Sequence, residues 1–179
     1  MTDGRKKGNR FENVVCRAIS QWLVQGRDWS DARVRELPFR RRFTDVTPLV
    51  GHWEGEGDIL HAPGIACPFC FEAKNQEGWE LDGIMANAGW PPWRWWDQCV
   101  EQANNTDGLW PVLIFTRNRR GIYCMLEEEL DTCLGLSSWK GISRSESVLR
   151  VRGPEGRAVT VATLSAITTV PLNRVGRLR

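Results

Sequence analysis

The segment that decides the fold is Phe69-Cys70-Phe71-Glu72-Ala73-Lys74. Successive side chains of a β-strand project from opposite faces of the sheet, so a strand here directs its two phenylalanines and Ala73 toward a core. Glu72 and Lys74 then project together from the other face. The segment therefore predicts a strand with one apolar face and one charged face.

A second short strand is predicted over Gly57–Leu60, followed by a turn around Pro63–Gly64. If the two strands pair as a hairpin, Asp58 at the start of the first lies opposite the end of the second, close to Glu72 and Lys74. Two carboxylates at close range repel each other unless a positive charge lies between them. Mg²⁺ suits that place, because it binds a few carboxylates and keeps its waters. The alternative interpretation is an edge strand whose Glu and Lys side chains are only solvated.

The rest of the chain shows helical and extended patterns. The further expected elements are a helix over 9–25, an extended segment over 32–42, a helix over 93–105, strands over 111–116 and 122–125, a short helix over 127–134, and a hairpin of strands 147–152 and 158–161. This order predicts a single compact α/β domain with a central mixed β-sheet flanked by helices. We expect a core domain over residues 1–135 and a basic, β-rich C-terminal extension with a loose end over residues 136–179.

The composition is that of an ordinary globular protein. The chain has 179 residues, of which 41% are hydrophobic and 26% charged, which suits one domain and excludes a disordered or fibrous protein. Its apolar runs are too short to span a membrane, and it opens without an apolar signal segment, so we expect a cytoplasmic protein without membrane contact. In that setting the six cysteines are expected to be reduced thiols.

The net charge of +2 hides an uneven distribution. Residues 1–42 and 140–179 each carry a net +6, and residues 43–139 carry −10. Of the 24 basic residues, 20 are arginine, which binds phosphate bidentately and stacks on bases, so the basic ends favour a nucleic-acid partner. A genome that prefers arginine codons would explain the same bias, and both interpretations stay open.

Glu12 lies beside the apolar stripe of the predicted first helix, where a carboxylate needs a partner. Asn9, three residues earlier, would make a capping box with Glu12. Coordination of a metal ion would satisfy the same carboxylate, and the spacing does not separate the two interpretations.

A C-x-x-C motif, Cys67-Pro68-Phe69-Cys70, has His52 and His61 nearby, and together they would make a Cys₂His₂ zinc site. The order differs from that of the familiar zinc finger, and a second C-x-x-C is lacking. Reduced, partly buried thiols are therefore the favoured interpretation.

Four of the ten tryptophans lie in the segment Gly89–Trp96. This cluster predicts either a stacking platform for unpaired bases, a dimer interface, or core packing. Trp96 falls on the inner face of the predicted helix, whereas both interpretations stay open for Trp90 and Trp93.

Taken in chain order, Glu12, Asp58, the triplet Glu72-Ala73-Lys74 and Gln98 resemble the PD-(D/E)xK nuclease superfamily. The segment Arg5–Glu12 is similar to the start of archaeal-type Holliday junction resolvases and their phage relatives. The resemblance covers about residues 5–125 and implies a restriction-endonuclease-like core.

The resemblance also implies a role for each matching residue. Asp58 and Glu72 would bind the metal with help from the backbone carbonyl of Ala73, and Glu12 would act through the metal or its water. Lys74 would orient or activate that water, and Gln98 would support the site. The expected metal is Mg²⁺, for which Mn²⁺ is expected to substitute.

The chain departs from the family pattern at Gly57, where a proline usually precedes the aspartate. The distance along the chain from Glu12 to Asp58 is also long compared with the compact resolvases. Glu54 and Glu56 are therefore alternative candidates for the ligand place of Asp58.

The activity that the resemblance implies is Mg²⁺-dependent hydrolysis of DNA phosphodiesters, above all at four-way (Holliday) junctions, by a homodimer with two matched active sites. The residues expected to contact DNA are Arg5, Lys6, Lys7, Arg10, Arg40, Arg41, Arg42, Arg119 and Arg120. A phage-encoded enzyme of this kind would act in the host cytoplasm. The alternatives are another PD-(D/E)xK nuclease, of the restriction or recombination type, and a non-catalytic, zinc-stabilised nucleic-acid-binding protein.

Overall fold

The structure is a computed structural model that describes residues 4–24, 28–33, 36–41, 54–55, 57–85, 89–105, 109–138 and 148–175. Its α-helices are α1 (Gly4–Leu23), α2 (Pro91–Asn104), α3 (Glu128–Leu134), α4 (Leu164–Thr168) and α5 (Leu172–Val175). Its strands are β1 (Phe39–Arg41), β2 (Ile59–His61), β3 (Phe69–Asn75), β4 (Trp110–Thr116), β5 (Tyr123–Glu127), β6 (Val148–Arg152) and β7 (Ala158–Thr163). Short 3₁₀ turns are η2 (Asp82–Met85), η3 (Leu136–Ser138) and η4 (Pro154–Gly156). In the described parts of the chain, every helix is too short or too polar to cross a membrane.

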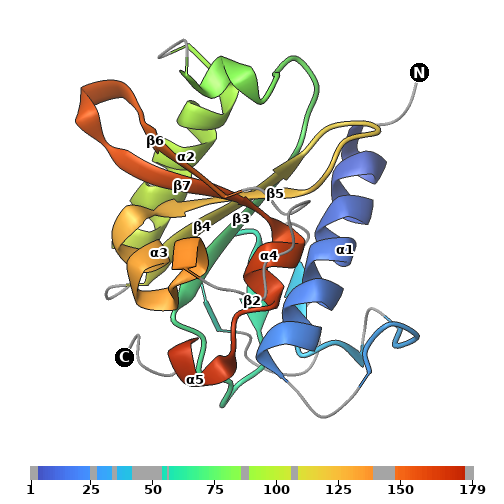
Figure 1. Cartoon of the computed structure of the whole chain (residues 1–179). Helices are drawn as coiled ribbons and strands as arrows, with labels where there is room; N and C mark the ends of the chain where they lie inside the picture. The colour runs from blue at the N-terminus through green and yellow to red at the C-terminus, as the bar shows by residue number, and fades with distance from the viewer. Residues whose placement is uncertain are drawn as a thin grey trace.

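A five-stranded mixed sheet forms the centre of the molecule (Figure 1). Its strand order is β3-β4-β5-β7-β6, in which β3 and β4 are parallel and every other neighbouring pair is antiparallel. Helices cover both faces, with α1, α3 and α4 on one face and α2 on the other. The predicted compact α/β domain with a central mixed sheet is confirmed, and the arrangement is consistent with a restriction-endonuclease-like core.

Strand β3 alternates as its sequence predicts. Its phenylalanines and Ala73 are buried under α1, where the ring of Phe69 stacks on Trp22 with centroids 5.6 Å apart. Glu72 and Lys74 project from the opposite face, on the side of α2. Because β3 is an edge strand of the sheet, the side that faces away from β4 is available to other segments.

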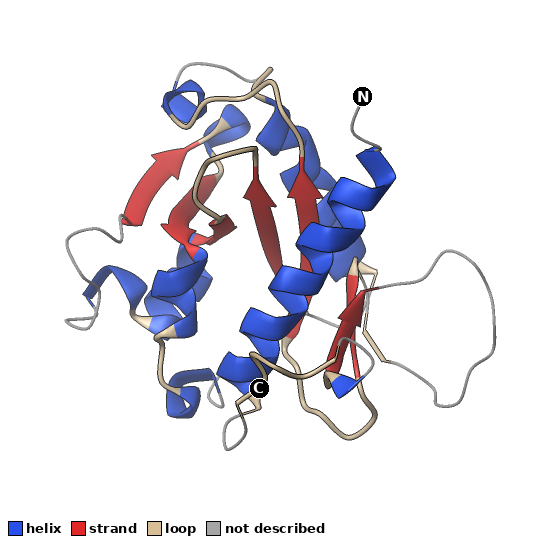
Figure 2. Ribbon diagram, turned by 90° about the vertical axis from the view of Figure 1, so that its right-hand side faces the viewer, coloured by secondary structure: helices blue, strands red, loops and turns tan. Residues whose placement is uncertain are grey.

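The hairpin predicted from Gly57–Leu60 and β3 is wrong. Strand β2 pairs antiparallel with β1 in a separate two-stranded sheet (Figure 2). Gly57, two residues before β2, makes a parallel bridge with Phe71 of β3. Gly57 has a φ of 84°, and a Cβ atom there would lie 2.3 Å from the carbonyl oxygen of Phe71. Only glycine allows the two backbones to come this close in that conformation.

The C-terminal part of the chain belongs to the same sheet. Strands β6 and β7 form an antiparallel hairpin, and β7 lies between β6 and β5. Asp131 of α3 is buried and ties this hairpin to the core, because its Oδ2 accepts hydrogen bonds from Thr160 Oγ1 at 3.0 Å and Arg150 Nε at 3.1 Å. The last part of the expected extension, residues 176–179, lies outside the described residues.

The tryptophan-rich segment belongs to the core. Trp90, Trp93, Trp95 and Trp96 are 4%, 2%, 7% and 2% exposed. They pack between α2 and the sheet, where Trp90 makes an edge-on contact with Phe115 of β4. Because buried rings present no face to a base, core packing is the correct interpretation for all four.

Candidate active site

Asp58 is attached to the free edge of β3 at two points. Its backbone N–H donates to the carbonyl oxygen of Phe71 at 2.9 Å. Its carboxylate oxygen Oδ2 accepts a hydrogen bond from the backbone N–H of Ala73 at 3.0 Å. The carboxylate is therefore held beside the middle of β3 although Asp58 itself belongs to another segment. The close approach of Gly57 makes this attachment possible.

Glu72, Lys74 and Gln98 join Asp58 in one hydrogen-bonded cluster. The ammonium group of Lys74 donates to Oε1 of Glu72 and to Oδ2 of Asp58, the latter at 3.4 Å. Gln98 of α2 donates from Nε2 to the same Oε1 of Glu72 at 2.8 Å. The cluster thus combines two carboxylates, an ammonium and an amide from three separate segments of the chain.

The exposure of the cluster is graded. The Glu72 side chain is 0% exposed, Lys74 is 18% exposed and Asp58 is 31% exposed. Oε1 of Glu72 receives both hydrogen bonds, whereas Oε2 is buried and has no hydrogen-bond partner among the described residues. A buried carboxylate oxygen without a partner is costly, so Oε2 is a suitable ligand atom for a cation.

The electrostatics follow from this burial. Burial and the neighbouring Asp58 carboxylate raise the pKa of Glu72 to about 7, although Lys74 acts in the opposite direction. Burial also disfavours the charge on Lys74, but the carboxylates of Asp58 and Glu72 more than offset it, so the pKa of Lys74 is raised. Lys74 is therefore a stable cation at neutral pH, while Glu72 gains and loses its proton near neutrality.

Glu12 of α1 lies close enough to Asp58 and Lys74 for their charges to affect its pKa. Burial and the charge of Asp58 raise its pKa, while Arg41 and Lys74 act to lower it. The capping box with Asn9 is wrong, because α1 begins at Gly4 and both residues lie inside the helix. Glu12 is therefore a half-buried carboxylate close to the cluster, without a capping role.

The cluster is compatible with a metal ion that takes few protein ligands. The described residues contain no group of three or more His, Cys, Asp or Glu side chains that would enclose a metal. Mg²⁺ commonly binds one or two carboxylates and keeps several waters. Asp58 and Glu72 offer such a pair, and Oε2 of Glu72 offers an unused oxygen.

The alternative ligands and the residues of the possible zinc site are described only in part. Glu54 pairs with His61, whose Nδ1 lies 3.8 Å from Oε2 of the glutamate, and Glu56 is outside the described residues. In the C-x-x-C motif, Cys70 is fully buried and burial raises the pKa of the Cys67 thiol to about 12. His52 lies outside the described residues.

The basic residues expected at the DNA are spread over three elements. Lys6 and Arg10 are exposed on α1, and Lys7 pairs with Glu77 at 2.6 Å. Arg119 and Arg120 are exposed in the turn between β4 and β5. The remaining predicted residues are half-buried in β1 (Arg40 and Arg41), outside the described residues (Arg42) or without a described side chain (Arg5).

Sequence reasoning missed how Asp58 is held in place. The hydrogen bond from the Ala73 N–H to its carboxylate and the bridge of Gly57 with Phe71 both use the backbone of β3. A glycine directly before a candidate acidic ligand was the available signal, because glycine is typical of a close backbone approach.

Comparison with protein families identifies the chain. The family model of the phage putative PDDEXK endonucleases matches residues 3–175. The chain belongs to this family. Searches of the curated proteins and of the solved structures with this chain found no match.

The PDDEXK family match extends the resemblance seen in the sequence. That resemblance covers about residues 5–125, whereas the family match also includes β6, β7 and the helices that follow. PD-(D/E)xK nucleases generally depend on divalent metal ions, which agrees with the carboxylate pair of Asp58 and Glu72. Membership supports a nuclease that acts on DNA.

Proposed function

We propose that the protein is a Mg²⁺-dependent DNA endonuclease that cuts four-way junctions as a homodimer, with its active site at Asp58, Glu72 and Lys74. The observation that carries the proposal is that one ammonium group binds two carboxylates at the edge of β3 that faces away from β4. Family membership supports the nuclease activity. The similarity of Arg5–Glu12 to Holliday junction resolvases supports a four-way junction as the substrate.

Asp58 and Glu72 would hold the metal ion. Oε2 of Glu72 fits this role because it is buried and has no hydrogen-bond partner in the described structure. The carbonyl of Ala73 is a further candidate, since it leaves β3 on the same side as the N–H that binds Asp58. When bound, a divalent ion supplies charge stabilisation at the phosphate and lowers the pKa of water, and Mn²⁺ is expected to replace Mg²⁺.

The other residues of the cluster have roles that follow from their charge. Lys74 stays protonated at neutral pH, so it acts as a hydrogen-bond donor and a fixed positive charge beside the scissile phosphate. Gln98 holds Oε1 of Glu72 in place and is a positioning residue. Glu12, with its raised pKa, is suited to hold or accept a proton near Asp58.

DNA binding would be largely electrostatic. The exposed residues Lys6 and Arg10 on α1 and Arg119 and Arg120 in the β4–β5 turn would contact phosphates. Binding is then expected to weaken steeply as the salt concentration rises. A four-way junction has two-fold symmetry, which a homodimer with two active sites matches. In this proposal, residues 1–135 form the nuclease core and residues 136–179 the extension.

The test is cleavage of three labelled DNAs, a four-way junction, a matched duplex and a single strand, in Mg²⁺, in Mn²⁺ and in EDTA. The wild-type chain should nick the junction symmetrically in either metal, and Glu72→Gln should abolish cutting. Glu101→Gln is the matched control, because Glu101 is an exposed glutamate of α2 outside the cluster.

Other outcomes assign other functions. Duplex cutting at fixed sequences would indicate a restriction-type PD-(D/E)xK nuclease. Stoichiometric zinc in the purified protein, together with no cleavage in Mg²⁺ or Mn²⁺, would indicate a non-catalytic binding protein and overturn the proposal.

A further inference from the structure

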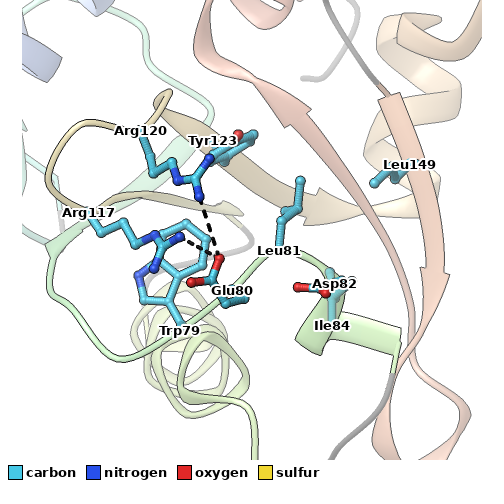
Figure 3. Close-up of a pocket in the computed structure, with 9 residues that line it drawn as sticks. All are labelled: Trp79, Glu80, Leu81, Asp82, Ile84, Arg117, Arg120, Tyr123 and Leu149. Carbon is cyan, nitrogen blue, oxygen red and sulfur yellow. Dashed lines mark hydrogen bonds and ion pairs between the residues drawn. The ribbon is translucent and has the colours of Figure 1, made fainter.

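A pocket lies outside the candidate active site, on the α2 face of the sheet (Figure 3). It has a volume of about 580 Å³ and is bounded by residues 79–84 after β3, by the β4–β5 turn and by Leu149 of β6. Pockets that bind small molecules typically have volumes of about 300–1,000 Å³. The pocket is therefore large enough for one nucleotide unit.

One half of the pocket is charged. Arg117 donates a hydrogen bond to Oε2 of Glu80, and Nη2 of Arg120 lies 3.9 Å from the same oxygen. Arg117 is only 16% exposed, and its guanidinium group lies over the ring of Trp79, 5.7 Å from the centroid. Because this cation–π contact does not involve Glu80, Arg117 would keep its position if the carboxylate moved away. Arg117 is therefore a positioned donor for an anionic oxygen, and Arg120, which is 59% exposed, lies on the same oxygen of Glu80.

The other half of the pocket is largely apolar, although Asp82 also lines it. Leu81, Tyr123 and Leu149 line it, and Figure 3 shows Leu81 between the two arginines and Leu149. Leu149 is 41% exposed, and Val14 is the other large hydrophobic side chain that is exposed in the described parts of the chain. Tyr123 and the exposed Leu149 lie on opposite sides of Leu81, so a planar base would pack over Leu81 between them.

We infer that this pocket binds one unpaired nucleotide of the DNA substrate, with the phosphate at Arg117 and Arg120 in place of the Glu80 carboxylate and the base against Tyr123 and Leu149. A carboxylate and a phosphate both accept hydrogen bonds from guanidinium groups, so Glu80 occupies the place that the phosphate would take. A base that is paired and stacked inside a duplex cannot enter such a pocket.

This inference rests on the proposed function and adds a substrate class to it, namely DNA with an unpaired nucleotide beside a duplex. The pocket is close to the candidate active site in the fold. Arg117 directly follows β4, in which Phe115 is the register partner of Lys74. The pocket and the side chains of Glu72 and Lys74 lie on the same face of the sheet.

The test measures binding by the full chain that carries Glu72→Gln, so that cleavage does not alter the probes. The probes are a matched duplex and the same duplex with a one-nucleotide bulge, and affinity is measured by fluorescence anisotropy in EDTA. We expect the bulged duplex to bind roughly tenfold more tightly than the matched duplex, because stacking of a single base on a protein side chain typically contributes that much to affinity.

The pocket variants should change this preference. Leu149→Ala and Arg120→Gln should each reduce it at least about threefold, because each removes one contact, on the apolar and on the charged side respectively. Glu80→Gln should increase it, because the competing carboxylate charge is gone. Arg152→Gln is the control: Arg152 is exposed on β6 but projects from the opposite face to Leu149.

The outcomes separate this inference from the proposed function. An absent preference, or one that survives in both Leu149→Ala and Arg120→Gln, overturns the inference, while cleavage by the wild-type chain still supports the nuclease. A shift of the oligomeric state in these variants, without a change in preference, would assign the pocket to a second copy of the chain and also overturn it. Loss of all DNA binding and cleavage in the wild type overturns both.

Discussion

The Nζ atom of Lys74 lies 3.4 Å from Oδ2 of Asp58 and donates a second hydrogen bond to Oε1 of Glu72. One ammonium group therefore joins two carboxylates that come from different segments, the residues before β2 and the strand β3. Without a positive charge between them, the two carboxylates would repel each other. Lys74 provides that charge.

Replacing Lys74 by methionine keeps much of the side-chain volume and removes the charge. In EDTA, we expect the free energy of unfolding to fall by about 3 kcal/mol, as is typical when one partner of a buried ion pair is removed. Mg²⁺ should restore more stability to Lys74→Met than to the wild type, because the bound cation then separates the carboxylates. Urea unfolding with and without Mg²⁺ measures both effects.

The control for this prediction is Lys7→Met. Lys7 pairs with Glu77, which is 52% exposed, and an exposed pair contributes at most about 1 kcal/mol. Equal losses in the two variants, or a response to Mg²⁺ that does not depend on Lys74, would contradict the role given to this residue.

The raised pKa of Glu72 makes stability depend on pH in a defined direction. Between its ordinary value of 4.5 and about 7, the folded protein holds a proton on Glu72 that the unfolded chain has lost. The free energy of unfolding therefore decreases as pH rises through this window. Above the window, the full cost of the buried Glu72 charge is present. In EDTA, Glu72→Gln should become progressively more stable than the wild type from pH 5 to about pH 7.5.

Urea midpoints at several pH values measure this difference. Glu101→Gln, which alters an exposed glutamate, should run parallel to the wild type over the same range. Parallel curves for Glu72→Gln and the wild type would show that Glu72 titrates in the folded protein as it does in the unfolded chain.

Substitution of Gly57 by alanine should detach Asp58 from β3. The new Cβ would lie 2.3 Å from the carbonyl oxygen of Phe71, and the φ of 84° is unfavourable for alanine. We expect a loss of about 2 kcal/mol or more in the free energy of unfolding, together with loss of cleavage.

Gly64→Ala is the control that separates the backbone strain of a positive φ from the steric clash with Phe71. Gly64 has a similar φ of 79°, but nothing lies within 4 Å of an added Cβ atom. Alanine there should cost about 1 kcal/mol and leave cleavage intact. If both variants lose the same stability and keep their activity, then the contact between Gly57 and Phe71 does not position Asp58.

Much of the fold follows from local patterns. The alternation in β3 predicts which of its side chains enter the core, and the order of elements predicts a mixed sheet between helices. Both are present. The partner of β2 was predicted wrongly, because a three-residue strand carries too little pattern to choose between neighbours. It pairs with β1, some twenty residues earlier in the chain.

The burial of the tryptophans also required the tertiary structure. A helix that packs on one surface is expected to have one apolar stripe. Helix α2 is covered further by the turn between β6 and β7, where a Cβ atom at Gly153 would lie 2.2 Å from the ring of Trp93. This second neighbour is separated from α2 by about fifty residues, so the sequence of the helix does not reveal it.

For the candidate site, sequence alone determined that Glu72 and Lys74 share a face, because the two-residue period of a strand is a local property of the backbone. Only the tertiary structure decided that Asp58 is hydrogen-bonded to that strand, that Gln98 donates to Glu72, and that Oε2 of Glu72 is buried. Those contacts join segments that are distant in the chain. Their geometry, and the burial that raises the pKa of Glu72, arise only when the packed sheet excludes water from the edge of β3.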